Sequence, residues 1–371
     1  MHRRAFLRTV AAIGMSAVHR AESGEKANIA WLAGVQQPPP PTPGSEPALL
    51  SSILVDAAGS PITTLTAWEP LRNSLRDRWL DFLGPLSRQH LQSRPAAPKF
   101  TTLGEERIDG IVRRLIRYKV EQHQPVEAYV LQPEQLTEPV PGVVVFHTTT
   151  NESLRQPAGV EGAAEKAFGL DLARQGCVTI CPRNYLWPKN HGIEAQGQAD
   201  QFRQRHPESR GMDRMLLDGL IAVDLLQAHP QVDSERMGCI GHSLGAKEAL
   251  YVAAFDERIK ATVSSEGGIG IRFSNWNADW YLGPTIKKPD FGLEHHQLLA
   301  LVAPRPFLLV GGDAADGRNS WPFIAAAMPV YQLYSPNSSP AIGLFNHHQG
   351  HSVPPEAHSK MLQWIEHYLR S

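Results

Sequence analysis

The chain has few cysteines, no long apolar run and no surplus of either charge. Its three cysteines lie in apolar, strand-like runs without Cys-x-x-Cys or Cys/His spacing, so we interpret them as buried core residues: Cys177, Cys181 and Cys239. No run of about 18 apolar residues follows the amino-terminal segment, which argues against a membrane-spanning helix there. The 36 lysines and arginines balance 37 aspartates and glutamates, which leaves no basic surplus for binding nucleic acid.

The amino terminus has the features of an export signal. The sequence "RRAFLR" (3–8) precedes an apolar stretch (9–18), a pattern typical of a twin-arginine leader, although His2 stands where Ser or Thr is usual. We predict a leader over 1–35, a proline-rich linker over 36–47, a helical extension over 48–100 and the main domain over 101–371. This predicts a periplasmic or secreted protein; the alternative is a cytosolic protein with a basic, frayed terminus.

Strand-like and helix-like segments alternate through the main domain. The preceding segment 68–83 has apolar residues at helical spacing and predicts a helix, whereas alternation across 107–131 predicts antiparallel strands. Continuous apolar runs predict buried strands at 142–147, 177–182, 236–241, 259–265, 306–312 and 341–346, and helices are predicted at 165–176, 212–230 and 358–369. This order predicts an α/β fold with a mainly parallel sheet covered by helices on both faces.

The pentapeptide "GHSLG" (241–245) lies between a predicted strand and a helix-like run. In a Gly-x-Ser-x-Gly nucleophile elbow the serine is held in a strained turn, and the flanking positions must be small because backbone passes close by. We therefore predict that Ser243 is the nucleophile of an α/β-hydrolase fold. The alternative is an ordinary serine helix cap.

A serine hydroxyl needs a base, and in α/β hydrolases the histidine follows the last strand. "FNHHQGHSVPP" (345–355) supplies three histidines there, of which we choose His351. The rival interpretation is a metal site formed with His295 and His296, but no His-Glu-x-x-His or similar ligand spacing supports it. No metal or organic cofactor is expected.

The acid that would orient the histidine remains open at this point. Asp313 and Asp316 follow the strand predicted at 306–312, whereas Glu266 follows the strand before it. Any of these carboxylates would stabilise the imidazolium. For the oxyanion hole we expect the backbone N–H of Leu244 and a second donor from the loop after 142–147, with Thr148 as the best candidate.

The segment from His229 to Gly268 resembles the dienelactone hydrolase and acetylxylan esterase branch of the α/β hydrolases, and more narrowly the glucuronoyl esterases of carbohydrate esterase family 15. In the latter family the serine lies in Gly-x-Ser-x-x-Gly-Lys and a catalytic glutamate follows one strand later. Lys247 and Glu266, which lies 23 residues after Ser243, match that spacing. The chain departs from the motif at Leu244, where arginine is normal, and at Ala246, where glycine is normal.

The resemblance implies a serine esterase that cleaves a small-molecule or oligosaccharide ester through an acyl-enzyme. It also implies that Lys247 binds a uronate carboxylate. Trp276 and Trp280, in the aromatic-rich segment 272–284, are candidates for a sugar-binding surface, with lid core as the alternative. Two other functions remain: a prolyl-oligopeptidase-like peptidase, and a hydrolase-fold protein that binds sugars without turnover.

Overall fold

The computed structural model describes residues 31–40, 50–121, 124–189, 192–337, 339 and 341–370. Residues 1–30 of the predicted leader and residues 41–49, which include most of the predicted linker, lie outside the described residues. Within the described part of the chain, no helix is long and apolar enough to cross a membrane.

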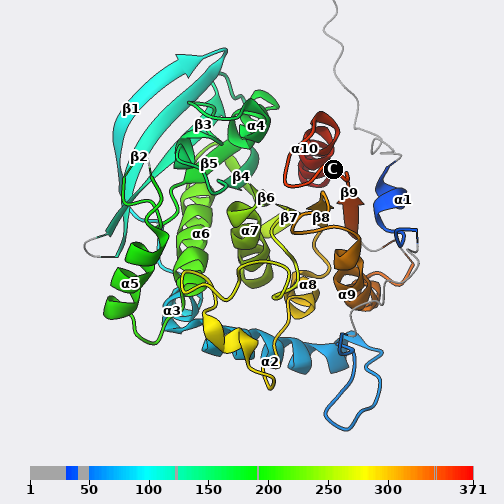
Figure 1. Cartoon of the computed structure of the whole chain (residues 1–371). Coiled ribbons are helices and arrows are strands. Elements are labelled where there is room, and N and C mark those ends of the chain that lie inside the picture. The colour runs from blue at the N-terminus through cyan, green and yellow to red at the C-terminus, as the bar shows by residue number, and fades with distance from the viewer. Residues whose placement is uncertain are drawn as a thin grey trace, which may run out of the picture.

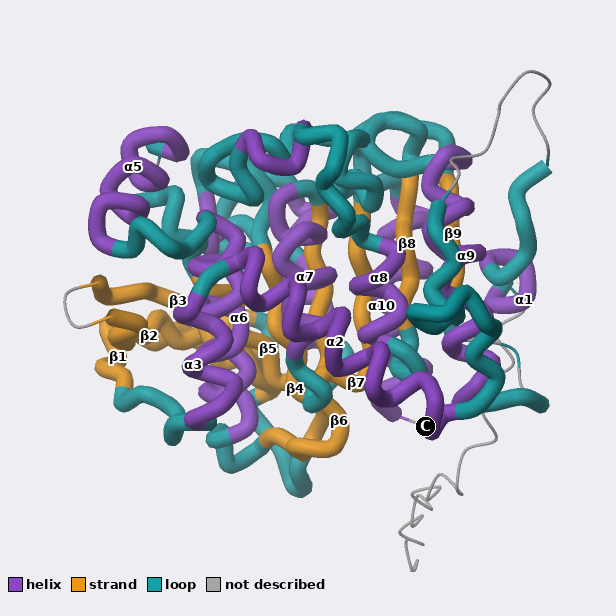
Figure 2. The backbone as a smooth tube through the Cα atoms, turned by 90° about the horizontal axis from the view of Figure 1, so that it is seen from below, coloured by secondary structure: helices purple, strands orange, loops and turns teal. Residues whose placement is uncertain are grey.

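One sheet of nine strands runs through the part of the chain that the structure describes, in the order β1-β2-β3-β5-β4-β6-β7-β8-β9. Figure 2 shows these strands following one another across the molecule. The first three strands are antiparallel, β3 meets β5 antiparallel, and all later pairs are parallel. The strands are β1 (Phe100–Ile108), β2 (Ile111–Glu121), β3 (Gln124–Pro133), β4 (Val140–Phe146), β5 (Val178–Pro182), β6 (Val232–His242), β7 (Ile259–Ser265), β8 (Phe307–Gly311) and β9 (Ile342–Asn346).

Helices cover both faces of the sheet and enclose a separate apolar core on each (Figure 1). One face carries α2 (Leu65–Leu83), α3 (Pro85–Ser93), α6 (Gly211–Gln227), α7 (Leu244–Phe255), α8 (His296–Val302) and α9 (Trp321–Tyr334). The other face carries α1 (Leu32–Val35), α4 (Phe168–Arg174) and α10 (Pro355–Arg370), while α5 (Ala195–Arg205) contacts α6. The predicted α/β-hydrolase architecture is confirmed.

The helices of the segment predicted as an amino-terminal extension pack on the main domain. Thr64 caps α2 by accepting a hydrogen bond from the N–H of Ala67 (3.3 Å), and α2 ends at Gly84 with φ 133°. On α6, buried Asp213 accepts hydrogen bonds from the N–H groups of Leu86 and Ser87 at the start of α3. These bonds satisfy donors that the first turn of a helix leaves unpaired, and they fix α3 on α6.

Residues 31–35, predicted as the end of the leader, are described in the structure. They include α1, which packs against β9 and α10. The three cysteines are free and buried, as predicted.

Candidate active site

Strand β6 runs directly into Ser243, whose φ of 58° places it in the left-handed region. A Cβ on Gly241 would lie 2.2 Å from the backbone of Gly245. A Cβ on Gly245 would lie 2.3 Å from the carbonyl oxygen of Phe146, at the end of β4. Both positions therefore require glycine for steric reasons, and the strained turn presents Ser243 at the carboxyl edge of the sheet.

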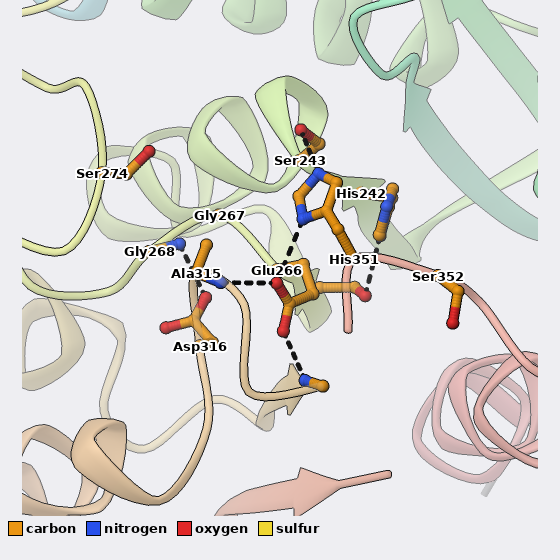
Figure 3. A network of polar contacts seen from close by, with 12 residues as sticks. His242, Ser243, Glu266, Gly267, Gly268, Ser274, Ala315, Asp316, His351 and Ser352 are labelled. Atoms are coloured by element: carbon orange, nitrogen blue, oxygen red, sulfur yellow. Dashed lines mark hydrogen bonds and ion pairs between the residues drawn. The ribbon is translucent and has the colours of Figure 1, made fainter. Parts of the chain in front are cut away.

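His351 lies in the loop between β9 and α10 and points at the serine (Figure 3). Its Nε2 is 2.9 Å from Ser243 Oγ, and its side chain is 45% exposed, so that solvent and a ligand can reach this side of the pair. The distance allows direct transfer of the hydroxyl proton to the imidazole.

Glu266, at the end of β7, completes a hydrogen-bonded chain with these two side chains. Its Oε2 lies 3.1 Å from His351 Nδ1, and its side chain is fully buried. It also accepts hydrogen bonds from the N–H groups of Gly312 and Ala315, the latter at 2.7 Å. Burial alone would raise the pKa of Glu266, but the bonds from His351, Ala315 and Gly312 outweigh burial and hold that pKa below its ordinary value.

The other two candidates for the acid, Asp316 and Asp313, form hydrogen bonds with other partners. Buried Asp316 accepts hydrogen bonds from the N–H groups of Gly268 and Ile269, both at 2.7 Å, and from the hydroxyl of Ser320. Exposed Asp313 pairs with Asn346 and His348. Among the three candidate acids, Glu266 is the one that the described contacts place at Nδ1 of His351, and no such contact joins Asp316 or Asp313 to this imidazole. Carboxylates follow both β7 and β8, and only the β7 residue faces the imidazole.

Leu244 begins α7, and its backbone N–H lies beside the serine in sequence, where an elbow places an oxyanion donor. Thr148 lies in the buried loop after β4, which the elbow approaches at Gly245. The carbonyl of Thr148 is 2.8 Å from Nδ1 of buried His147. Burial lowers the pKa of His147 to about 4, so the ring is neutral and donates this bond from Nδ1.

Sequence reasoning missed His147 and Asn184, which hold this loop. The N–H of Asn184, after β5, donates to Nε2 of His147 (3.1 Å), and its side-chain amide donates to buried Glu248 on α7 (3.0 Å). The sequence did offer one signal for His147: it is a polar residue directly after the apolar run of β4, at the carboxyl edge of the sheet.

Lys247 and Trp276, which the sequence suggested as substrate-binding residues, lie in the interior of the molecule. Lys247 is 4% exposed and Trp276 is 1% exposed, and the Lys247 Nζ lies 4.0 Å from the centre of the Trp276 ring. Burial lowers the pKa of Lys247 to about 7, against a smaller opposing effect of Asp316. Trp280 is only partly buried.

The histidines proposed for the rival metal site, His295 and His296, form hydrogen bonds within the protein. His295 is fully buried; its Nδ1 lies 2.8 Å from the carbonyl of Ile269 and its Nε2 lies 2.9 Å from the Tyr251 hydroxyl. Nε2 of His296 lies 3.1 Å from the carbonyl of Ser51. Within the described residues, no group of three or more His, Cys, Asp or Glu side chains is arranged to hold a metal ion.

The sheet, the elbow and the serine–histidine–glutamate geometry define the α/β-hydrolase class. The chain matches the model of the dienelactone hydrolase family over residues 126–289, a match that fits that branch of the α/β hydrolases. It is a serine hydrolase of carboxylic esters.

The chain is similar to several known proteins. It is 27% identical over 219 residues to a protein named as a hydrolase, YtaP of Bacillus subtilis, a match that covers 56% of this chain and 71% of that protein. A glucuronoyl esterase from Solibacter usitatus superposes with a TM-score of 0.67 at 16% identity, covering 88% of this chain and 99% of that one. Acetyl xylan esterase 1 from a Thermoanaerobacterium species superposes at 0.50 with 15% identity, covering 76% and 92%. At these identities the structural likeness shows the fold.

Proposed function

We propose that the protein removes an acetyl or glucuronoyl ester from a carbohydrate through an acyl-enzyme on Ser243. The observation that carries the proposal is the hydrogen-bonded chain Ser243–His351–Glu266, in which the distances are 2.9 and 3.1 Å. A buried carboxylate, a half-exposed imidazole and a strained serine are together what an activated serine nucleophile needs.

Each residue has a distinct task in the proposed reaction. Ser243 Oγ attacks the ester carbonyl while its proton passes to His351, and Glu266 stabilises the imidazolium that forms. The oxyanion accepts hydrogen bonds from the backbone N–H groups of Leu244 and Thr148. The alcohol then leaves with the proton from His351. Water, activated by the same histidine, attacks the acyl carbonyl and releases the acid.

The carbohydrate substrate is supported by the class of the structural neighbours, which are named as glucuronoyl and acetyl xylan esterases. Partly exposed Trp280 is the aromatic side chain we propose for the sugar contact. Because Lys247 is buried and Leu244 replaces the arginine of the glucuronoyl esterase motif, neither supplies the cationic contact to a uronate that the resemblance implied.

The proposal is tested with purified protein lacking the first 30 residues, assayed on p-nitrophenyl acetate and on a benzyl glucuronate ester. We expect Ser243→Ala to lose at least about 10³-fold in kcat and Glu266→Gln about 10²–10⁴-fold, since each removes a member of the hydrogen-bonded chain. Asp316→Asn, the matched change at a buried carboxylate that does not contact His351, should lose less than Glu266→Gln.

The outcomes separate the competing functions. Cleavage of the glucuronate ester favours a glucuronoyl esterase, whereas cleavage of acetate alone favours an acetyl esterase. A wild-type protein that cleaves peptides but neither ester would favour the peptidase, and a folded protein that binds sugars without reacting with a fluorophosphonate would favour the binding protein. Export through the predicted leader is a separate proposal, tested by finding the protein in the periplasm or medium and its retention after Arg3→Lys and Arg4→Lys.

A further inference from the structure

Lys247 lies one helical turn after Ser243 on α7, and its ammonium group is buried beside the loop that follows Glu266. Nζ donates hydrogen bonds to the carbonyl oxygen of Gly267 (2.6 Å) and to the hydroxyl of Ser274 (3.0 Å). The rings of Trp276 and Tyr281 cover it at 4.0 and 5.1 Å. The described contacts of this cation are therefore a carbonyl, a hydroxyl and two aromatic faces, without a hydrogen-bonded carboxylate.

The loop after Glu266 is held at successive peptide groups by buried side chains from four different segments. Figure 3 shows two parts of this arrangement: Asp316 bonded to the N–H of Gly268, and Glu266 bonded to Ala315 and His351. Lys247 donates to the Gly267 carbonyl, and Trp276 donates to the Gly268 carbonyl (2.7 Å). Asp316 accepts from the N–H groups of Gly268 and Ile269. His295 forms a hydrogen bond with the Ile269 carbonyl.

Glu266 itself has a left-handed backbone, with φ 55°, at the point where β7 ends. Such a conformation persists in a residue with a Cβ only where its surroundings enforce it. Its own N–H donates to the Val310 carbonyl (2.8 Å), and Lys247 holds the Gly267–Gly268 peptide group, which lies one peptide beyond Glu266. The lysine thus joins the helix that follows Ser243 to the residue that follows the glutamate.

We propose that Lys247 is a positioning residue that fixes Glu266 relative to Ser243 by holding the Gly267 carbonyl. The inference rests on the proposed role of Glu266 as the acid. A substrate-binding role does not fit, because Gly267, Ser274 and the two rings already surround Nζ. Loss of the ammonium group leaves the Gly267 carbonyl without this buried donor, so that the Gly267–Gly268 peptide keeps only its hydrogen bond to Asp316 and is held less firmly.

The test is a double-mutant cycle between Lys247→Met and Glu266→Gln, read by the rate at which a fluorophosphonate labels Ser243. In that reaction Oγ attacks phosphorus, the serine proton passes to His351 and fluoride leaves, so the rate reports activation of the serine without depending on which ester is the substrate. We expect Lys247→Met to slow labelling and kcat by about 10–100-fold, with KM changed less than about twofold. In the Glu266→Gln background it should add less than about twofold.

Two controls separate positioning from general damage. Lys288→Met makes the same change at an exposed lysine and should leave the rate unchanged. Ser274→Ala removes the second Nζ contact but keeps the Gly267 bond, and should cost less than about threefold. If Lys247→Met does not fold, Lys247→Gln takes its place in the cycle with the same expected dependence on Glu266.

Each result decides between the two proposals. Normal labelling of Lys247→Met, an equal loss in both backgrounds, or a raised KM with normal kcat would each overturn the positioning role while the proposed function stands. If wild-type protein is neither labelled nor active on any ester, the proposed function fails, and the positioning role fails with it. Labelling without turnover of carbohydrate esters would overturn only the substrate class.

Discussion

Glu248 follows Lys247 on α7 but reaches the opposite side of the elbow. Its carboxyl accepts the Asn184 amide, Asn184 donates to His147, and His147 donates to the Thr148 carbonyl. Burial raises the pKa of Glu248 well above its ordinary value and lowers the pKa of His147 to about 4. Burial therefore favours the uncharged forms of both side chains, and this hydrogen-bonded chain holds the loop that supplies the proposed oxyanion donor.

The raised pKa of Glu248 makes stability depend on pH. Above pH 4.5 the unfolded chain loses this proton while the folded protein keeps it, so the folded state is destabilised by about 1.4 kcal/mol per pH unit until its own pKa is reached. Glu248→Gln keeps an acceptor for Asn184 but cannot ionise. We expect the variant to gain stability relative to wild type as pH rises, measured by urea unfolding at pH 5 and pH 8.

Asp218 also has a raised pKa, of about 6, and contributes to the pH dependence of both proteins. The informative quantity is therefore the difference between Glu248→Gln and wild type at each pH. An identical slope in the two proteins would show that Glu248 is ionised in the folded state.

At the residue scale, the sequence was sufficient to predict that Ser243 and His351 lie together, because chain order and the elbow motif are local signals. It could not choose the acid. Parallel strands end at one edge of a sheet, so carboxylates after β7 and β8 are equally well placed by topology. The choice depends on which side chain reaches the imidazole, and in the structure the N–H groups of Gly312 and Ala315 hold Glu266 in that position.

At the element scale, the short helix α1 is packed onto the sheet although it lies before the proline-rich segment. Val35 is 4% exposed and packs against Gly343 of β9. The approach is so close that a Cβ added to Gly343 would lie 2.7 Å from the Val35 side chain. The Trp31 ring lies 6.3 Å from Trp364 on α10, and its Nε1 donates to Gln363 at 2.8 Å. The composition of the segment 36–47 indicated a spacer but carried no information on what precedes it.

This packing predicts a stability cost for a small change in α1. Val35→Ala removes two buried methyl groups and should lower the free energy of unfolding by about 1–2 kcal/mol, measured by urea unfolding. The neighbouring Gly34 faces open space, so Gly34→Ala should not destabilise the protein. Unchanged stability of Val35→Ala would mean that α1 is detached from β9 in solution.

The helices α9 and α5 were not predicted, and their sequences show why. In α9, "WPFIAAAMPVYQLY" is apolar almost throughout, so it lacks the polar face that reveals a helix, and it contains Pro329. In α5, "AQGQADQFRQR" is almost entirely polar, with Ala199 and Phe202 as its buried residues. The strands from β4 onward were predicted closely, because a buried parallel strand is a continuous apolar run.

At the scale of the whole molecule, α2 and α3 complete the core on the face that carries α7. Trp79 on α2 is fully buried; its ring stacks on His295 at 5.5 Å and meets Tyr251 of α7 edge-on at 5.9 Å. His295 in turn holds the Ile269 carbonyl in the loop after Glu266. The segment predicted as an extension therefore supports the loop that presents the proposed acid.

Because α2 and α3 complete this core, we predict that residues 101–371 do not form an independent domain. A chain beginning at Thr101 would uncover Tyr251 and His295 and would leave the buried carboxylate of Asp213 without the Leu86 and Ser87 donors. We expect it to be insoluble or to lack a cooperative unfolding transition, whereas residues 31–371 should unfold cooperatively. Within the longer chain, Trp79→Ala should cost about 3–5 kcal/mol. A soluble 101–371 fragment with cooperative unfolding would instead establish the boundary at residue 100 as a true domain boundary.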